Sequence, residues 1–171
     1  APLIHGGAQE RSRRAGTENV AEIGGMAAAA ERALSRMEEK TATEKRLQDH
    51  LIRRIEEEIP YCRLNGHRTN RLPGNVNFSF RFVEGESVLI MLDMKGICAS
   101  SGSACTSGAL DPSHVLMAVG LSQEEARGSV RFTLSEDNTM EEIDTAVDAL
   151  KEIIDKLRGM SCEYEHFLKN R

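Results

Sequence analysis

The sequence predicts an α/β fold with one long helical arm, and three patterns along its 171 residues support this prediction. Between Met26 and Ile59 there is no Gly or Pro, and apolar residues recur at the three- and four-residue spacings of a helix face. The segments 76–80 and 130–134 alternate apolar with polar residues, as half-buried strands do. Apolar residues return at helical spacing over 139–159. Helices are therefore expected to pack against a small sheet.

The helical arm begins where Asn19 and Glu22 stand three residues apart, the arrangement of an N-cap residue and its reciprocal carboxylate. Residues 3–16, which precede it, lack apolar periodicity and are expected to form a loop. We expect either one long helix that Pro60 ends or two helices in line with a kink near Thr41–Thr43. The apolar stripe consists of Val20, Ile23, Ala27, Ala30, Leu34, Met37, Leu47, Leu51, Ile55 and Ile59.

Beyond Pro60 the pattern shortens into strands, loops and short helices. The expected elements are a strand at Arg63–Asn65, a loop at 68–74, a strand at Val76–Phe80, a helix at Glu86–Met94 and a strand at Ile97–Ala99. Further along, the expected elements are a helix from Asp111-Pro112 to Gly120, a helix opened by Ser122 with Glu125, a strand at Val130–Leu134, a helix from the capping box of Thr139 and Glu142 to Gly159, and one or two helical turns over 160–171.

Composition excludes several classes of function. Aromatic residues make up 4% of the chain, with no Trp, which argues against base-stacking platforms for single-stranded nucleic acid. The net charge of −5 argues against broad binding to nucleic acid or to an anionic membrane surface. No apolar stretch approaches the length of a membrane span. With 40% hydrophobic residues, the chain can form a packed core.

Cysteine usage predicts a reducing compartment such as the cytoplasm. The four cysteines are Cys62, Cys98, Cys105 and Cys162. None forms a CxxC pair, and no His stands at zinc-ligand spacing from two of them, so no metal site is expected. Their even number leaves a disulfide framework as the alternative. Cys98 is expected to be buried, because it lies between two apolar residues on a predicted strand.

Cys105 is the first candidate for chemistry, because it lies in the segment Ser100–Gly108 of small, mostly polar residues. A thiol with so little to pack against is expected to be exposed and mobile, and an accessible thiolate is reactive. A linker thiol without chemistry is the alternative, since no His stands beside it in the sequence.

Arg131 is the second candidate. Val130 and Phe132 flank it on a predicted strand, so its side chain is expected on the face opposite theirs. A guanidinium held on a rigid strand suits bidentate binding of a carboxylate. The alternative is an exposed or edge-strand arginine without a ligand.

Thr17 is the third candidate, because it follows Gly16 and precedes a helix start. A hydroxyl and free backbone N–H groups at such a position suit a phosphate. The alternative is an ordinary capped loop, in which the nearby arginines form a solvated turn or an interface.

Together these segments resemble the C-terminal part of a NifS/IscS-type cysteine desulfurase; in chain order they are GGAQERSRRAGTEN, EGESVLIMLDMKGICASSGSACTSG, PSHVLMAVGLS and GSVRFTLSEDNTMEEID. The stretch SSGSACTSG is the most specific, and it indicates the subgroup with a long cysteine loop. The family consists of homodimeric pyridoxal-phosphate enzymes of the class-V aminotransferase group with fold-type I architecture. The resemblance implies an α+β small domain, in which a small, mainly antiparallel sheet packs against helices behind a long N-terminal helix.

The resemblance also implies an activity and a role for each candidate residue. Enzymes of this family take sulfur from L-cysteine and yield L-alanine and an enzyme persulfide, which serves iron–sulfur cluster or thio-cofactor assembly. By resemblance, Cys105 would be the catalytic nucleophile that becomes the persulfide, and Arg131 would bind the substrate carboxylate. Thr17 would bind the phosphate of pyridoxal phosphate in the partner subunit's site. A sulfur-acceptor or iron–sulfur scaffold protein would be the partner.

The lysine that binds the cofactor in this family follows a His, and no lysine of this sequence does so. The chain also begins with Ala-Pro, so we expect that it was cut from a longer protein and that the lysine lies upstream. Residues 1–19 are then expected to be a remnant of the large cofactor domain with its connecting loop. Residues 20–171 are expected to be the small domain with the connecting helix, which would be inactive alone.

Two other interpretations stay open. The chain resembles the family only imperfectly at Ala8, Ser135 and Cys162. One alternative is another class-V pyridoxal-phosphate aminotransferase or lyase, in which Cys105 takes no part. The other is a non-catalytic module that binds a sulfur acceptor through its tail and its cysteine loop.

Overall fold

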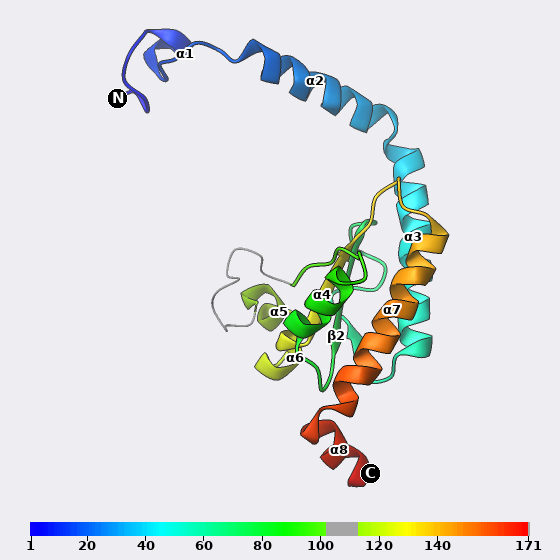
Figure 1. Ribbon diagram of the computed structural model, residues 1–171. Helices are drawn as coiled ribbons and strands as arrows, with labels where there is room; N and C mark the ends of the chain where they lie inside the picture. The colour runs from blue at the N-terminus through cyan, green and yellow to red at the C-terminus, as the bar shows by residue number, and fades with distance from the viewer. Residues whose placement is uncertain (102–112, 171) are drawn as a thin grey trace. The chain divides into compact units, whose positions relative to one another are not determined.

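The computed structural model describes residues 1–101 and 113–170 (Figure 1). Its helices are α1 (Gln9–Ser12), α2 (Val20–Ser35), α3 (Met37–Glu58), α4 (Gly85–Asp93), α5 (His114–Ala118), α6 (Gln123–Arg127), α7 (Met140–Gly159) and α8 (Cys162–Lys169). Its strands are β1 (Cys62–Leu64), β2 (Asn75–Phe80) and β3 (Ser129–Thr133). The chain divides into two compact units, Ala1–Glu38 and Glu39–Arg171. The predicted start of a helix at Asp111-Pro112 lies outside the described residues.

Helix α2 is the main element of the first unit. Asn19 caps it as predicted, because its side chain accepts the N–H of Glu22 at 3.3 Å. None of the residues of α2 is buried, and the apolar side chains of Val20 and Leu34 are 74% and 69% exposed. In the part of the chain that the structure describes, the apolar side chains predicted to form a stripe along α2 are therefore exposed.

The predicted loop over residues 3–16 contains one short element, α1, with a left-handed backbone. The three residues Glu10–Ser12 have φ angles from 49° to 61°. L-amino acids adopt this conformation at a cost of about 1–2 kcal/mol each. A backbone hydrogen bond of 2.9 Å from Leu3 to Arg13 closes the loop around this turn.

The helical arm is broken at Arg36, which separates α2 from α3 with φ −110° and ψ 7°. Of the two predicted alternatives, two helices is the correct one. The predicted kink near Thr41–Thr43 is wrong, because both threonines lie inside α3. A β-branched residue lowers helix stability by only a few tenths of a kcal/mol, which the surrounding helix tolerates.

The three strands form one antiparallel sheet in the order β1-β2-β3. The alternation predicted for the two longer strands is confirmed, since Val76, Phe78, Val130 and Phe132 share one buried face. The residues of this face belong to one hydrophobic core together with residues of α3, α4 and α7. The core residues of these helices are Leu47, Leu51, Ile52, Ile55, Val88, Leu92, Ile143, Val147, Ala149, Leu150, Ile153 and Ile154.

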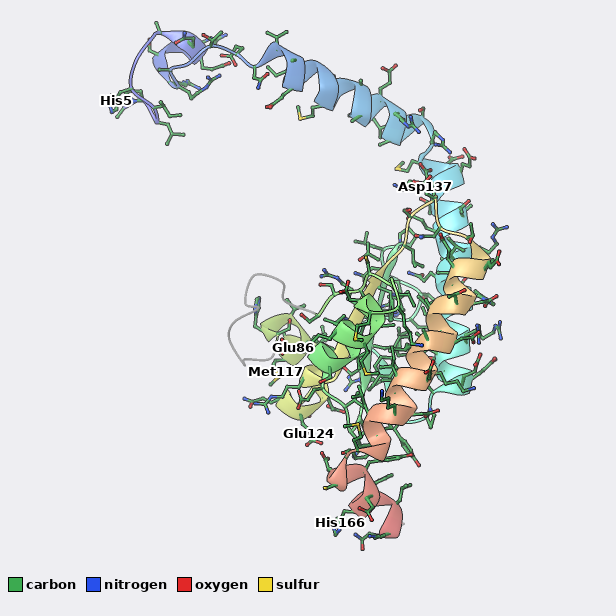
Figure 2. All side chains as sticks on the ribbon, in the orientation of Figure 1. His5, Glu86, Met117, Glu124, Asp137 and His166 are labelled. Atoms are coloured by element: carbon green, nitrogen blue, oxygen red, sulfur yellow. The ribbon has the colours of Figure 1, made fainter. Side chains whose placement is uncertain are left out.

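Helices α3 and α7 run side by side along the sheet, and side chains are most crowded where they meet it (Figures 1 and 2). Ion pairs join the two helices: Arg54 bonds Asp144 at 3.0 Å and Asp148 at 2.7 Å. His50 bonds the same Asp144 at 2.6 Å. The hydrogen bonds from His50 and Arg54 hold the pKa of the Asp144 carboxyl below its ordinary value. The pair α3 and α7 thus forms one layer behind the sheet.

The capping box predicted for Thr139 and Glu142 is confirmed, and Ser122 with Glu125 opens a helix as predicted. Ser122 and Glu125 exchange hydrogen bonds at the start of α6, and Thr139 and Glu142 do so at the start of α7. Helix α7 ends at Gly159 as predicted, and the tail forms two turns of helix, α8. These elements agree with the sequence because their signals are local.

The predicted strand at Ile97–Ala99 is not formed, and the prediction that Cys98 is buried is wrong, since its thiol is exposed. The N–H of Ile97 bonds the carbonyl of Leu92 at 3.0 Å, so this segment still closes the end of α4. Ile97 and Ala99 both pack against the core. Cys98, which lies between them, therefore points away from the core.

Candidate active site

The face of the sheet opposite the core is polar, and it carries the candidate residue Arg131. Val130 and Phe132 are 0% and 5% exposed on the core face, so Arg131 projects from the other face, as predicted. Its side chain is half-buried, and its Nε is buried without a hydrogen-bond partner among the described residues. Buried polar groups in proteins nearly always have partners. A carboxylate is the group that best satisfies a guanidinium in this position.

Ser100 pairs with Arg131 on the outer edge of β3. The N–H of Arg131 bonds the carbonyl of Ser100 at 2.6 Å, and the N–H of Ser100 bonds the carbonyl of Arg131 at 3.0 Å. Ser100 is the first residue of the predicted cysteine loop, whereas Cys105 itself lies outside the described residues. The structure therefore brings the start of the cysteine loop beside Arg131.

Two asparagines continue this row of polar residues across the sheet. Asn77 on β2 stands opposite Arg131, and the N–H of Asn65 bonds the carbonyl of Asn77 at 2.8 Å. The Nδ2 of Asn65 donates to Asn77 Oδ1 at 2.6 Å and to Ser79 Oγ at 2.9 Å. Asn65, Asn77 and Ser79 are all buried. The row Asn65, Asn77, Arg131 and Ser100 thus crosses the whole polar face.

Sequence reasoning did not single out Asn65, Asn77 or Arg71 as site residues. The alternation of β2 shows that Asn77 faces away from the core, but only strand pairing shows that it adjoins Arg131. Arg71 donates to the carbonyl of Asn65 at 2.7 Å, while its Nε and Nη1 are buried without partners among the described residues. Burial lowers the pKa of the Arg71 guanidinium. No sequence signal marks this arginine.

Two glycines allow the close packing that positions β3. A Cβ at Gly128 would stand 2.2 Å from the carbonyl oxygen of Phe80, and one at Gly85 would stand 2.6 Å from that of Ser129. Neither distance is possible for a real side chain without movement of the backbone. These contacts hold the start of β3 against β2 and α4, three residues or fewer from Arg131.

Thr17 belongs to the first unit, whereas Arg131 belongs to the second. Its side chain is exposed, and it follows Gly16, whose φ of 111° favours glycine. The capped start of α2 comes two residues after Thr17. An exposed hydroxyl before the N-terminus of a long helix is a suitable environment for a phosphate.

The described cysteines are Cys62, Cys98 and Cys162, and all three are free thiols. Burial, and then the charge of Glu56, raise the pKa of the Cys62 thiol, which lowers its reactivity at neutral pH. Over residues 1–101 and 113–170, no group of three or more His, Cys, Asp or Glu side chains is placed to hold a metal ion. In the same residues no helix has the length and apolar character needed to cross a membrane.

The fold and this polar face place the chain in a known class of proteins. The aminotransferase class-V family matches residues 5–146, and the chain belongs to this family. Among curated relatives it is 51% identical, over 160 residues, to the cysteine desulfurase IscS of Dictyoglomus turgidum. It is 50% identical, over 171 residues, to the cysteine desulfurase IscS of Clostridium botulinum strain Hall.

A solved structure of a NifS-like protein from Rickettsia africae has the same fold. Its TM-score is 0.78 at 34% sequence identity, and the match covers 91% of this chain and 40% of that one. The resemblance to NifS/IscS-type proteins and the predicted fold, a small antiparallel sheet packed against helices, are thereby confirmed. The matches to the two IscS proteins cover 94% and 99% of this chain but only 41% and 43% of theirs. The chain therefore spans about two fifths of the length of these relatives.

The class-V family implies pyridoxal phosphate, and the side chains present fit this cofactor in part. Thr17 suits the phosphate of the cofactor. The Nε of Arg131, which has no partner among the described residues, suits the carboxylate of a substrate. All six lysines of the sequence are described, and they lie on α3, after α4, and on α7 and α8, not on the polar face of the sheet. Their ion pairs are Lys40–Glu44, Lys45–Asp49, Lys95–Glu152, Lys151–Glu58 and Lys169–Glu165, while Lys156 is exposed. No lysine of this chain fits as the covalent anchor.

Proposed function

We propose that this chain is the small domain of a cysteine desulfurase, which transfers sulfur from L-cysteine to Cys105 and releases L-alanine. The observation that carries the proposal is the pairing of Ser100 with Arg131. Cys105 follows Ser100 by five residues, and an extended chain of that length reaches up to about 18 Å. Arg131, which would bind the substrate, therefore lies at the same edge of β3 as the start of the segment that would accept the sulfur.

The sulfur transfer needs one electron sink and one nucleophile. When bound, pyridoxal phosphate supplies the sink that makes the Cβ–S bond of cysteine labile. The thiolate of Cys105 attacks the substrate sulfur, so that an S–S bond forms while the Cβ–S bond breaks and Cβ takes up a proton. The products are L-alanine and a persulfide on Cys105. Arg131 would hold the substrate carboxylate, which orients the substrate sulfur for this attack.

The rest of the proposed assembly follows from the family. Residues 1–19 would belong to the large cofactor domain, and residues 20–171 would form the small domain with its connecting helix. The remaining three fifths of a protein as long as the IscS relatives would supply the lysine that this chain does not place at the site. Thr17 would bind the cofactor phosphate in the partner subunit's site of a homodimer. A sulfur acceptor or an iron–sulfur scaffold protein would receive the sulfur in the cytoplasm.

The test uses the full-length protein that contains this chain, with pyridoxal phosphate and L-cysteine. The Cys105→Ala variant should lose both alanine formation and the persulfide, which mass spectrometry detects as one added sulfur atom on the peptide with Cys105. The matched control is Cys98→Ala, which removes an exposed thiol seven residues earlier and should retain both. Unchanged sulfide release by Cys105→Ala would contradict the proposal and favour another class-V enzyme in which this cysteine takes no part.

A further inference from the structure

Asn77 and Arg131 stand directly opposite each other on the polar face of the sheet. The backbone hydrogen bonds on either side define the type of pair. The carbonyl of Asn77 accepts from Asn65 on the β1 side, while the N–H and the carbonyl of Arg131 both bond Ser100 on the other side. Asn77 and Arg131 therefore form a non-hydrogen-bonded antiparallel pair, the type in which facing side chains are closest, with Cβ atoms about 4.5–5.5 Å apart.

The side-chain amide of Asn77 has a defined orientation. Asn65 uses both N–H groups of its own amide, one on Asn77 Oδ1 at 2.6 Å and one on Ser79 Oγ at 2.9 Å. In this network the oxygen of the Asn77 amide is turned toward Asn65, while the Oδ1 of Asn65 is itself buried without a partner among the described residues. The other end of the amide, the Nδ2 donor, is left for the side of the pair where Arg131 stands.

Two hydrogen-bond donors thus lie next to each other, and neither can satisfy the other. The Nε of Arg131 is buried without a partner among the described residues, and the Asn77 oxygen that could accept from it is turned toward Asn65. A carboxylate has two oxygens, one for the guanidinium and one for the amide, and it accepts from both at once.

We propose that Asn77 is a second binding residue for the substrate carboxylate, beside Arg131, and that Asn65 is the positioning residue that turns the Asn77 amide toward the substrate. This inference rests on the proposed function and adds to it the residues that distinguish an amino acid from an amine without a carboxylate. A neutral amide donor next to the guanidinium strengthens binding of the carboxylate without adding a second charge.

The experiment measures equilibrium binding of two probes to the full-length protein by calorimetry. S-methyl-L-cysteine carries the carboxylate, and S-methylcysteamine is the same molecule without it. The Asn77→Ala variant should bind S-methyl-L-cysteine about 10- to 100-fold more weakly, the loss of one hydrogen bond to a charged group, and should bind S-methylcysteamine as the wild type does. The matched control is Asn75→Ala, on the same face of β2 and opposite Thr133, which should bind both probes normally.

The Asn65→Asp variant tests the orientation of the Asn77 amide. An aspartate at position 65 accepts instead of donating, so the Asn77 amide should reverse and present its oxygen to the substrate carboxylate. Binding of S-methyl-L-cysteine should then fall by at least 10-fold, while binding of S-methylcysteamine is retained. Loss of the fold would weaken the binding of both probes together, so the ratio of the two affinities separates an effect on the carboxylate from a loss of stability.

The outcomes separate this inference from the function on which it rests. The inference is overturned if Asn77→Ala or Asn65→Asp binds S-methyl-L-cysteine as tightly as the wild type, or if the wild type does not bind that probe. If the wild type forms no alanine from L-cysteine but Asn77→Ala still loses carboxylate binding, the carboxylate site stands and the desulfurase activity does not. If alanine forms and carboxylate binding is unchanged in Asn77→Ala, only the role of Asn77 fails.

Discussion

Gly128, which precedes β3 directly, lies against the backbone at the end of β2, and Gly128→Ala is the sharpest test of how β3 is held. An alanine Cβ would stand 2.2 Å from the carbonyl oxygen of Phe80 and 3.1 Å from that of Val83. The φ of Gly128 is −80°, an ordinary value for alanine, so these contacts and not the backbone conformation oppose the substitution. Ordinary contact begins at 3.4 Å, so the two backbones must separate by about 1 Å.

The cost of that separation follows from what lies between the two backbones. The N–H of Phe80 bonds the carbonyl of Gly128 at 2.9 Å, and moving them apart weakens or breaks this bond. Overpacking of this kind costs about 1–3 kcal/mol, and a lost hydrogen bond adds about 1 kcal/mol. We therefore expect Gly128→Ala to lower the free energy of unfolding by about 2–4 kcal/mol.

Urea unfolding followed by far-ultraviolet circular dichroism measures this change, with the transition midpoint falling and the slope unchanged. Gly159→Ala is the matched control, because a Cβ at Gly159 meets no atom within 4 Å and the residue lies in a helix. The control should be as stable as the wild type or more stable, by up to about 1 kcal/mol. A Gly128→Ala protein within about 0.5 kcal/mol of the wild type would show that β3 is not held by this contact.

Two further predictions concern ionisable groups away from the polar face. Asp144→Asn should lower the melting temperature at pH 7, because the bonds from His50 and Arg54 depress the pKa of this carboxyl in the folded protein. That stabilisation is complete above the unfolded pKa of about 3.9 and is lost as pH falls through the lower folded pKa, so the difference in melting temperature should shrink as pH falls below about 4; a difference that stays constant would refute this cause. Cys62 should react with iodoacetamide more slowly than Cys98 at pH 8, because burial raises the pKa of its thiol, and peptide mass spectrometry should show the two rates converging in urea.

Elements with local signals could be predicted from the sequence. The capping boxes at Ser122 and Thr139 each need only residues three positions apart, and both are present in the structure. The apolar period of α7 likewise predicted its buried face, including Val147 and Ile154. In each case the interaction that stabilises the element lies within a few residues of the signal, so no knowledge of the fold is needed.

Elements that depend on distant partners could not be predicted in this way. Cys98 lies between two apolar residues, but Ile97 closes the end of α4 instead of pairing with a strand, so the thiol turns outward. The break at Arg36 has no Gly or Pro to mark it. The alternation of apolar and polar residues around Arg131 correctly predicted the face of the sheet from which its side chain projects. It could not show which residue of the neighbouring strand stands opposite Arg131.

By itself, the sequence determined the class of fold, the family to which the chain belongs, and the three candidate residues Thr17, Cys105 and Arg131. Periodicity, caps and motifs are properties of neighbouring residues, and they can be read along the chain. Only the tertiary structure decided that Asn65, Asn77, Arg131 and Ser100 form one row. Strand pairing joins residues from 12 positions apart, as for Asn65 and Asn77, to 54 positions apart, as for Asn77 and Arg131, and a shift of one residue would turn these side chains to the other face. The polar site is therefore a consequence of register, which no short segment of the sequence contains.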